Sequence, residues 1–509
     1  MNYENVLVKH FIFAVALANA LISANMEQTN LFMRRVHMRK KLLGVLLCTA
    51  MAATMLTGCG GGSGDSGNNS GSSSSNKKDS SEKKEVTLTD DGKVFNIRVW
   101  NEEFKDRVTD HYPGYEKVDD NTGKIGDIQV NWVTVSNQDN AYQNALDEAI
   151  MNQDKASADD KIDMFLVEAD YALKYVQSDA TVDIVKDLGV SEDALANQYQ
   201  YTKDVVTDES GALKGASWQG CPAGLVYRSD VAKKVFGTDE PDKIQENFSD
   251  WDKFAESADK LKDAGYKITA TVNDTYRVFS NNVTSKWVVD GKINVDENIK
   301  KWVDMSKEMV DKGQTTTEPL WETEWKKGFD SKGDVFAYFG PSWFFDFSMA
   351  ERDEKTNIPT YDLAKDGMWR LCAGPQSFYW GGTWLCGANG SDNKTLIKEM
   401  IENMTTNEDV LTDIAKKDSD YVNNQNVTAT LEKDEKFGSE VLGGQNPMPL
   451  FNEKIKEVNL SNLSIYDQGC NEEFQNAMKE YFDGNVDSYE AALEAFYKNV
   501  ETKYPELKH

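Results

Sequence analysis

The stretch from Ile128 to Val167, IQVNWVTVSNQDNAYQNALDEAIMNQDKASADDKIDMFLV, decides the fold class of this chain. Its two ends, Ile128 to Val135 and Ile162 to Val167, are rich in the β-branched and aromatic residues typical of strands. Between them, apolar side chains recur at helical spacing: Tyr142, Ala145, Leu146, Ala149 and Ile150. A strand, a helix and a second strand in this order predict parallel strands joined by a right-handed crossover, and therefore an α/β fold.

The same alternation continues on both sides of this stretch. Val94 to Trp100 predicts an earlier strand, and Tyr266 to Val272 and Val335 to Phe339 predict later ones. A helix from Asp250 has one apolar face and ends near Gly265, and Asp487 with Glu490 predicts a capping box for the last helix. Because 509 residues, 39% of them apolar, exceed what one core usually serves, we expect two or more lobes.

Composition excludes several classes of function. With 56 basic and 85 acidic residues the chain carries a net charge of −29, which argues against nucleic acid as a partner. His111 is the one histidine expected inside the fold, so histidine catalysis and a His-ligated metal lose support. The sequence contains neither a glycine-rich phosphate loop nor a pair of Cys-x-x-Cys motifs, so we expect no cofactor and no metal.

The N-terminal region is typical of an export signal. Met38 and three basic residues, Arg39 to Lys41, precede an uncharged run, Leu42 to Leu56, which is shorter than the roughly 20 residues of a membrane span. Leu56-Thr57-Gly58-Cys59 resembles the lipobox of bacterial lipoproteins, which implies that residues 38–58 are removed and that Cys59 is acylated; the alternative is a plain secretory signal. Residues 59–85 predict a flexible tether, and residues 1–37 either a start codon placed too early or a functional extension.

Four cysteines remain after the signal and Cys59: Cys221, Cys372, Cys386 and Cys470. Cys372 and Cys386 bracket a short segment and could form a disulfide outside the cell. Four buried free thiols are the other interpretation, and spacing does not decide between the two.

Tryptophans beside turns are the candidate binding residues. Five of them follow a strand or adjoin glycine and proline: Trp100, Trp218, Trp343, Trp380 and Trp384. Polar neighbours include Asn101, Glu102, Gln219 and Asp346. Flat aromatic faces with amides and carboxylates suit the apolar face and the hydroxyls of a sugar. The competing interpretation is a structural role in a core, which helical or strand spacing favours for Trp132, Trp251 and Trp302, whereas Trp321 and Trp325 fit a partly exposed helix face.

An ordered set of motifs resembles the family 1 extracellular solute-binding lipoproteins of carbohydrate ABC importers, which share the fold of maltose-binding protein. The motifs follow the lipobox: Ser217 to Asp230 (SWQGCPAGLVYRSD), Ala337 to Trp343 (AYFGPSW), Phe378 to Leu385 (FYWGGTWL) and Leu442 to Pro447 (LGGQNP). The resemblance implies two lobes, each a mostly parallel sheet flanked by helices, joined by two or three crossings and closing by hinge motion.

At the matching positions, the resemblance implies that Ser217 to Tyr227 form the first crossing between the lobes. It also implies that Trp343 stacks on a sugar ring and that the Asp170 carboxylate binds the ligand. Arg228 departs from the usual Tyr-Asn-Lys-Asp pattern, which weakens any ligand role for that turn. The first lobe is expected in residues 86–216 and about 370–430, and the second in 217–369 and about 431–509.

The leading hypothesis is therefore a monomeric receptor on the extracellular face of the cytoplasmic membrane, most typical of Gram-positive bacteria and held there by its lipid anchor alone. It would bind an oligosaccharide between its lobes and deliver it to the permease subunits of an ABC importer, with no catalytic step. The first alternative is an exported glycoside hydrolase using a carboxylate pair such as Glu102 and Glu168. It is disfavoured because no eightfold strand and helix repeat is present. The second is a surface carbohydrate adhesin.

Overall fold

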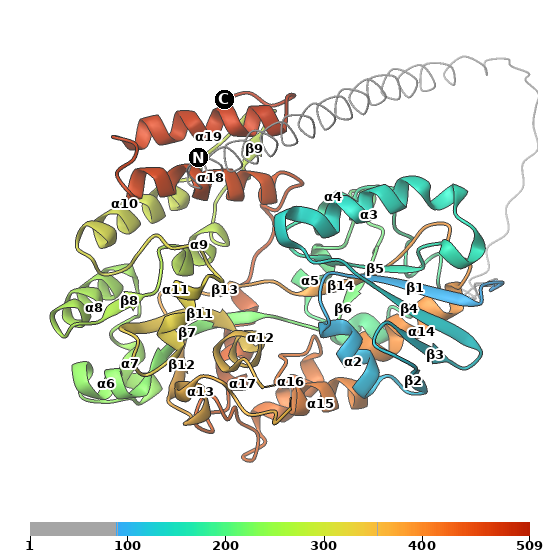
Figure 1. Cartoon of the computed structure of the whole chain (residues 1–509), viewed down its shortest axis with the longest axis horizontal. Helices are drawn as coiled ribbons and strands as arrows, with labels where there is room; N and C mark the ends of the chain where they lie inside the picture. Colours follow the sequence, from blue (N-terminus) through green and yellow to red (C-terminus); the bar gives the residue numbers. More distant parts are fainter. Residues whose placement is uncertain (1–87, 89, 354) are drawn as a thin grey trace, which may run out of the picture. The chain divides into compact units, whose positions relative to one another are not determined.

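The computed structural model describes residues 88, 90–353 and 355–509. They form a mixed α/β fold of two lobes, each built on a β-sheet with helices packed against it (Figure 1). The expected N-terminal extension, signal peptide, acylated Cys59 and tether lie outside the described residues. Within the part that is described, no helix combines the length and the apolar character needed to cross a bilayer.

The first lobe contains a seven-stranded sheet in the order β2-β3-β4-β1-β5-β14-β6. β1 pairs in parallel with β4 and β5, as the strand and helix alternation predicts, whereas the other neighbours are antiparallel, so the sheet is mixed. The strands are β1 (Val94–Val99), β2 (Tyr115–Lys117), β3 (Thr122–Ile125), β4 (Ile128–Thr134), β5 (Met164–Glu168), β6 (Ala216–Ser217) and β14 (Thr383–Gly387). The helices of this part of the chain are α2 (Glu103–His111), α3 (Ala141–Asn152), α4 (Ala172–Val176), α5 (Gln200–Asp204), α14 (Lys394–Thr405) and α15 (Glu408–Lys417).

The second lobe contains a sheet in the order β12-β7-β11-β8, with β13 also paired to β7. Because β11, β12 and β13 all run opposite to β7, this sheet is largely antiparallel, unlike the mostly parallel sheet that was expected; β11 and β8 are parallel. The strands are β7 (Pro222–Arg228), β8 (Lys267–Thr269), β11 (Val335–Pro341), β12 (Trp369–Cys372) and β13 (Phe378–Tyr379), beside a hairpin of β9 (Val288–Val289) and β10 (Lys292–Ile293).

Helices cover this second sheet and continue beyond it. They are α6 (Ser229–Phe236), α7 (Pro241–Gln245), α8 (Trp251–Asp263), α9 (Asn273–Ser280), α10 (Glu297–Asp311), α11 (Thr323–Lys326), α12 (Ser342–Phe344), α13 (Asp362–Lys365), α16 (Gln425–Glu432), α17 (Met448–Lys454), α18 (Asp467–Phe482) and α19 (Tyr489–Lys503). Helix α8 begins as predicted, since Asp250 accepts the Lys253 N–H at 2.8 Å. The capping box predicted at Asp487 is wrong, because Ser488 caps α19 by accepting the Ala491 N–H at 3.2 Å.

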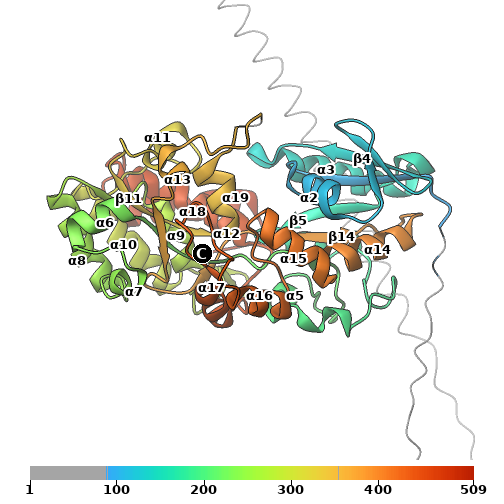
Figure 2. The same ribbon diagram turned by 90° about the horizontal axis from the view of Figure 1, so that it is seen from below.

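Within the residues that the structure describes, the chain passes between the lobes at three places. The first crossing joins β6 to β7, and the second, Trp380 to Gly382, joins β13 to β14 (Figure 1). Figure 2 shows the two lobes side by side from below, with β4, β5 and β14 in the first and β11 in the second. The second comes later than the boundary expected near residue 370, because β12 and β13 still pair with β7. Helix α15 packs against α2 and α17 against β7, so a third crossing lies between α15 and α17.

The three crossings are hydrogen-bonded to one another. The Gly220 N–H donates to the Tyr421 carbonyl at 2.7 Å, and the Trp380 N–H donates to the Cys221 carbonyl at 3.2 Å. The first crossing therefore connects the other two, and the three segments form one hinge.

All four cysteines of the described part are buried and free. Cys372 lies on β12 in the second lobe and Cys386 on β14 in the first, so the short segment between them spans two different sheets. The structure therefore contains no disulfide between Cys372 and Cys386, and the interpretation of four buried free thiols is confirmed.

Candidate ligand-binding cleft

Two adjoining pockets lie between the lobes. The aromatic pocket, about 570 Å³, adjoins the crossings and is lined by Trp100, Trp321, Trp343, Phe347 and Trp380 among others. The polar pocket, about 510 Å³, lies between α9, α18 and the first-lobe segments 137–140 and 168–171. They share six lining residues: Asn137, Glu168, Asp170, Arg277, Trp321 and Trp380. Together they form one cleft, and each half has a size typical of small-molecule sites.

Three indoles gather on the second-lobe side of the aromatic pocket. Trp343 is the second residue of α12, which follows β11 directly, and its ring centre lies 5.4 Å from that of Trp380 and 6.4 Å from that of Trp321. The Trp343 indole N–H donates to the Trp380 carbonyl at 3.1 Å, which fixes the ring. Trp100 follows β1 and reaches the same pocket from the first lobe. The pocket therefore offers aromatic faces from both lobes.

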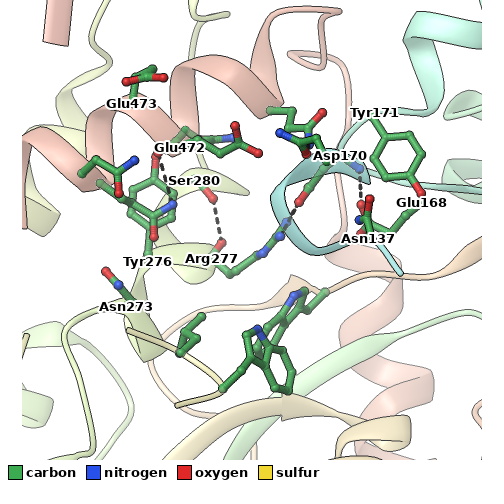
Figure 3. A pocket seen from close by; sticks show the side chains of 18 of the residues that line it. Asn137, Glu168, Asp170, Tyr171, Asn273, Tyr276, Arg277, Ser280, Glu472 and Glu473 are labelled. Carbon is green, nitrogen blue, oxygen red and sulfur yellow. Dashed lines mark hydrogen bonds and ion pairs between the residues drawn. The ribbon is translucent and has the colours of Figure 1, made fainter. Parts of the chain in front are cut away.

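An ion pair joins the lobes in the middle of the cleft. Arg277 on α9 donates through both Nη atoms to the two carboxylate oxygens of Asp170, and Nη1 lies 2.6 Å from Oδ1 (Figure 3). The Arg277 guanidinium also lies 5.8 Å from the ring centre of Trp380. A second contact between the lobes is the Gln468 amide, which donates to Asn140 Oδ1 at 3.0 Å. Residues from both lobes thus converge on the wall that the two pockets share.

Two carboxyl groups of the cleft have raised pKa values. Burial, followed by the charge of Asp170, raises the pKa of Glu168 to about 8. Burial, followed by the charge of Asp420, raises the pKa of Glu103 to about 7, while the Gln219 amide donates to its Oε1 at 2.7 Å. Near neutral pH a substantial fraction of each carboxyl is protonated, so these groups can donate as well as accept hydrogen bonds.

Most of the residues singled out from the sequence line the cleft: Trp100, Asn101, Asp170, Gln219, Trp343 and Trp380. Glu102 does not. It is exposed and contacts Lys105 and Thr134, while its neighbour Glu103 lines the aromatic pocket. The difference follows from the first turn of α2, because adjacent helical residues point about 100° apart.

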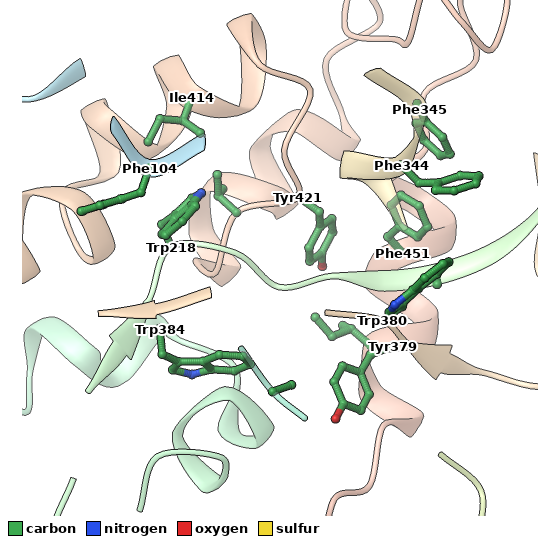
Figure 4. Close-up of a cluster of buried hydrophobic side chains, with 14 of the residues drawn as sticks. Phe104, Trp218, Phe344, Phe345, Tyr379, Trp380, Trp384, Ile414, Tyr421 and Phe451 are labelled. Carbon is green, nitrogen blue, oxygen red and sulfur yellow. The ribbon is translucent and has the colours of Figure 1, made fainter. Parts of the chain in front are cut away.

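Trp218 and Trp384, both expected at the ligand site, are core residues and line neither pocket. Trp218 is fully buried, stacks on Phe104 with ring centres 5.2 Å apart, and its indole N–H donates to Asp420 (Figure 4). Trp384 is buried on β14, and its indole N–H donates to the Thr202 carbonyl at 2.7 Å. Each indole has its polar atom satisfied inside the protein and leaves no face for a ligand.

Several residues that line the cleft were not found from the sequence. The sequence predicts a helix face for Trp321, but this residue precedes α11 and has a left-handed backbone (φ 74°). Its side chain is 43% exposed and lines both pockets. Its neighbour Trp325 is buried instead of partly exposed. Asn137, Tyr171 and Arg277 carried no sequence signal beyond their polarity, since they meet only through folding.

Comparisons with known proteins agree with this architecture. Residues 117–438 match the model of a family described as bacterial extracellular solute-binding protein. Among solved structures, an ABC transporter associated binding protein from B. animalis subsp. lactis, in complex with β-1,6-galactobiose, is 17% identical with a TM-score of 0.59 over 82% of this chain and 100% of its own.

Two further structures are similar. The galacto-N-biose-/lacto-N-biose I-binding protein of Bifidobacterium longum, in complex with lacto-N-biose, is 13% identical (TM-score 0.59; 82% and 100% of the two chains). The sugar-binding protein MalE of Xanthomonas citri is 14% identical (TM-score 0.58; 80% and 96%). A comparison with curated protein sequences finds no match. At such low identities, the structural likeness establishes the two-lobed fold.

Proposed function

Since the chain belongs to the bacterial extracellular solute-binding proteins, we propose that it is a receptor that binds an oligosaccharide in the cleft and delivers it to an ABC importer. The observation that carries the proposal is the aromatic pocket, where Trp321, Trp343 and Trp380 face the cleft from one lobe and Trp100 from the other. Indole faces stack on the apolar faces of sugar rings, and the neighbouring carboxyl and amide groups bind hydroxyls. Structural relatives whose descriptions name bound disaccharides support the choice of ligand.

Binding and closure are one event in this proposal. A sugar that contacts both lobes stabilises the closed arrangement over the open one by its differential contacts, and a transporter can then recognise that arrangement. At about 25 cal/mol per Å² of apolar area, two or three stacked faces can supply micromolar affinity, about −8 kcal/mol, after ordering costs. No covalent step is needed. The carboxylate pair considered for a hydrolase is not assembled, because Glu102 lies outside both pockets.

The proposal extends to the place where the receptor works. The basic and apolar run before Leu56-Thr57-Gly58-Cys59 supports export followed by acylation of Cys59, and residues 59–85 would tether the lobes to the outer face of the cytoplasmic membrane. The partners are then the permease subunits of the importer, and the receptor works as a monomer. Export of the chain with and without Cys59→Ala, followed by membrane fractionation, tests the anchor.

Calorimetry with xylo-, manno-, malto- and galacto-oligosaccharides tests the binding function. We expect a saturable heat with at least one series and no new reducing ends after prolonged incubation. New reducing ends would indicate an enzyme instead. The absence of binding to every series would contradict the proposed receptor.

A further inference from the structure

We infer that the cleft selects glycans that carry a protonated amino group, and that Asn137, Glu168 and Tyr171 hold this ammonium. The inference rests on the proposed sugar-binding function and makes it more specific, because it names the chemical class of sugar. It concerns the wall shared by the two pockets, beside the Asp170–Arg277 ion pair.

Two buried polar atoms of this wall have no hydrogen-bond partner among the described residues: the Tyr171 hydroxyl and Asn137 Oδ1. Tyr171 is only 4% exposed yet lines the polar pocket, and Figure 3 shows its hydroxyl directed toward Glu168 and Asn137. A buried polar atom without a partner costs about 1–3 kcal/mol. Both atoms can accept hydrogen bonds, so a ligand that brings several donors satisfies them together.

The charges around the wall favour a cation. Among the described residues that line the two pockets, six carry carboxyl groups: Glu103, Asp139, Glu168, Asp170, Glu472 and Glu473. Arg277 is the one basic residue in the same set, and Asp170 already engages both of its Nη atoms. Glu472 is paired away from the cleft, with Lys503 at 2.9 Å. The remaining carboxylates attract a positive ligand group and repel the carboxylate of a uronic acid.

Glu168 is the group best placed to receive the ammonium. Within the described residues it forms no ion pair, and its side chain accepts one hydrogen bond, from the Asp170 backbone N–H at 2.7 Å. An ammonium has three N–H donors, which match the Glu168 carboxylate, Asn137 Oδ1 and the Tyr171 hydroxyl. Because burial holds the pKa of Tyr171 well above its usual value, this hydroxyl stays neutral and does not add a charge.

Release of the Glu168 proton on ligand binding is a measurement that tests the inference separately from affinity. The pKa of Glu168 is raised to about 8, so at pH 7 most of this carboxyl is protonated. An ammonium bound beside it favours the carboxylate, so the Glu168 proton passes to the buffer while the ligand keeps its own. Calorimetry in two buffers of different ionisation heat measures this proton, and a neutral sugar that leaves Glu168 protonated releases none.

The test compares sugars that differ in one substituent. The protein is titrated with four amino sugars: glucosamine, galactosamine, mannosamine and the chitosan dimer. The neutral counterparts are glucose, galactose, mannose and cellobiose, and the acidic ones are glucuronic and galacturonic acids. In at least one series we expect the amino sugar to bind tenfold or more tightly than its neutral counterpart, with proton release and with no binding of the acid. If neutral sugars bind and no amino sugar binds more tightly, the inference is wrong, but the proposed function as a sugar receptor remains supported. If neither these sugars nor any of the four oligosaccharide series binds, the proposed function itself fails.

Variants assign the effect to the wall. Glu168→Gln should lower the affinity for the preferred amino sugar at least tenfold, change that for its neutral counterpart less than threefold and abolish proton release. Tyr171→Phe, which keeps the buried ring, should also weaken the amino sugar selectively. The control is Glu102→Gln, a nearby carboxylate outside both pockets, which should change neither affinity. An equal loss for amino and neutral sugars in Glu168→Gln would overturn the assignment.

Discussion

At the scale of single residues, Trp343 and Trp384 show how similar sequence settings lead to different roles. Trp343 is half-buried and lines the cleft, whereas Trp384 is 1% exposed in the core of the first lobe. A ring that faces the cleft stabilises the folded chain less than one surrounded by packed neighbours. Truncation of the two side chains should therefore separate binding from stability.

We expect Trp343→Ala to weaken oligosaccharide binding tenfold or more while leaving the melting temperature nearly unchanged. Trp384→Ala should instead lower the free energy of unfolding by about 3–5 kcal/mol, the usual cost of emptying a large aromatic site. Calorimetry and urea unfolding of both variants measure the two effects. A Trp343→Ala protein that unfolds early yet still binds sugar would place this residue in the core.

The residue scale also shows where prediction from the sequence succeeds. Trp132 and Trp302 are buried as strand and helix spacing predicts, and Trp251 stacks on Phe279 with ring centres 4.2 Å apart. Trp380 and Trp384 have the same glycine neighbours, but Trp380 begins the second crossing and Trp384 follows it on β14, and only Trp380 faces the cleft. Side-chain direction at a turn depends on backbone angles that composition does not specify.

At the scale of elements, the strands and helices follow the sequence closely and the connections do not. The predicted strand from Val94 and the predicted helix from Asp250 appear within a residue of their expected starts. The short strands β12 and β13 gave no signal of their own, because two to four residues show no periodicity, and the second crossing was therefore expected too early. The cleft residues on α9 and α18 meet only in three dimensions, so spacing along the chain does not reveal them.

The second crossing depends on glycine. Gly381 has φ 73°, and a Cβ atom there would lie 3.4 Å from the ring of Trp343. We expect Gly381→Ala to lower the free energy of unfolding by about 1–2 kcal/mol, the cost of a left-handed alanine, and to weaken sugar binding because the added methyl group lies beside the Trp343 ring in the aromatic pocket that Gly381 lines.

Gly237, which follows α6, is the matched control for this prediction. It has φ 79°, and a Cβ atom there would meet no other atom within 4 Å. Gly237→Ala should show the same loss of stability by urea unfolding with unchanged sugar affinity by calorimetry. Equal affinities in the two variants would show that the second crossing does not control the cleft.

At the scale of the whole molecule, the Asp170–Arg277 ion pair connects the lobes directly. Asp170→Asn removes one charge of the pair, so we expect the lobes to separate more often without ligand and the radius of gyration from small-angle X-ray scattering to rise. Asp346→Asn is the control, because Asp346 pairs with Arg352 at 2.8 Å within the second lobe. Identical scattering from both variants would mean that the pair does not hold the lobes together.

Buried carboxyls should make the stability of the whole protein depend on pH. Burial raises the pKa values of Asp274 and Asp467 to about 7, alongside the raised values of Glu103 and Glu168. Between about pH 4 and 7 the folded chain holds protons that the unfolded chain has released, so stability falls as pH rises through this range. Each group contributes at most about 1.4 kcal/mol per pH unit.

We therefore expect a higher melting temperature at pH 5.5 than at pH 8 when ionic strength is constant. Glu168→Gln should reduce the difference, since glutamine does not titrate. Differential scanning calorimetry of both proteins across this range measures the slope. A melting temperature that rises from pH 5.5 to pH 8 would contradict the assignment of these carboxyls.

The four buried thiols have a practical consequence. Cys221 lies within the first crossing, whereas Cys372, Cys386 and Cys470 lie inside the lobes. In a form that starts after Cys59, a maleimide should therefore label Cys221 each time the hinge loosens and reach the other three sulfurs only when a lobe unfolds. Labelling followed by mass spectrometry would then measure the rate at which the hinge between the lobes opens, and a bound sugar should lower the rate of Cys221 labelling.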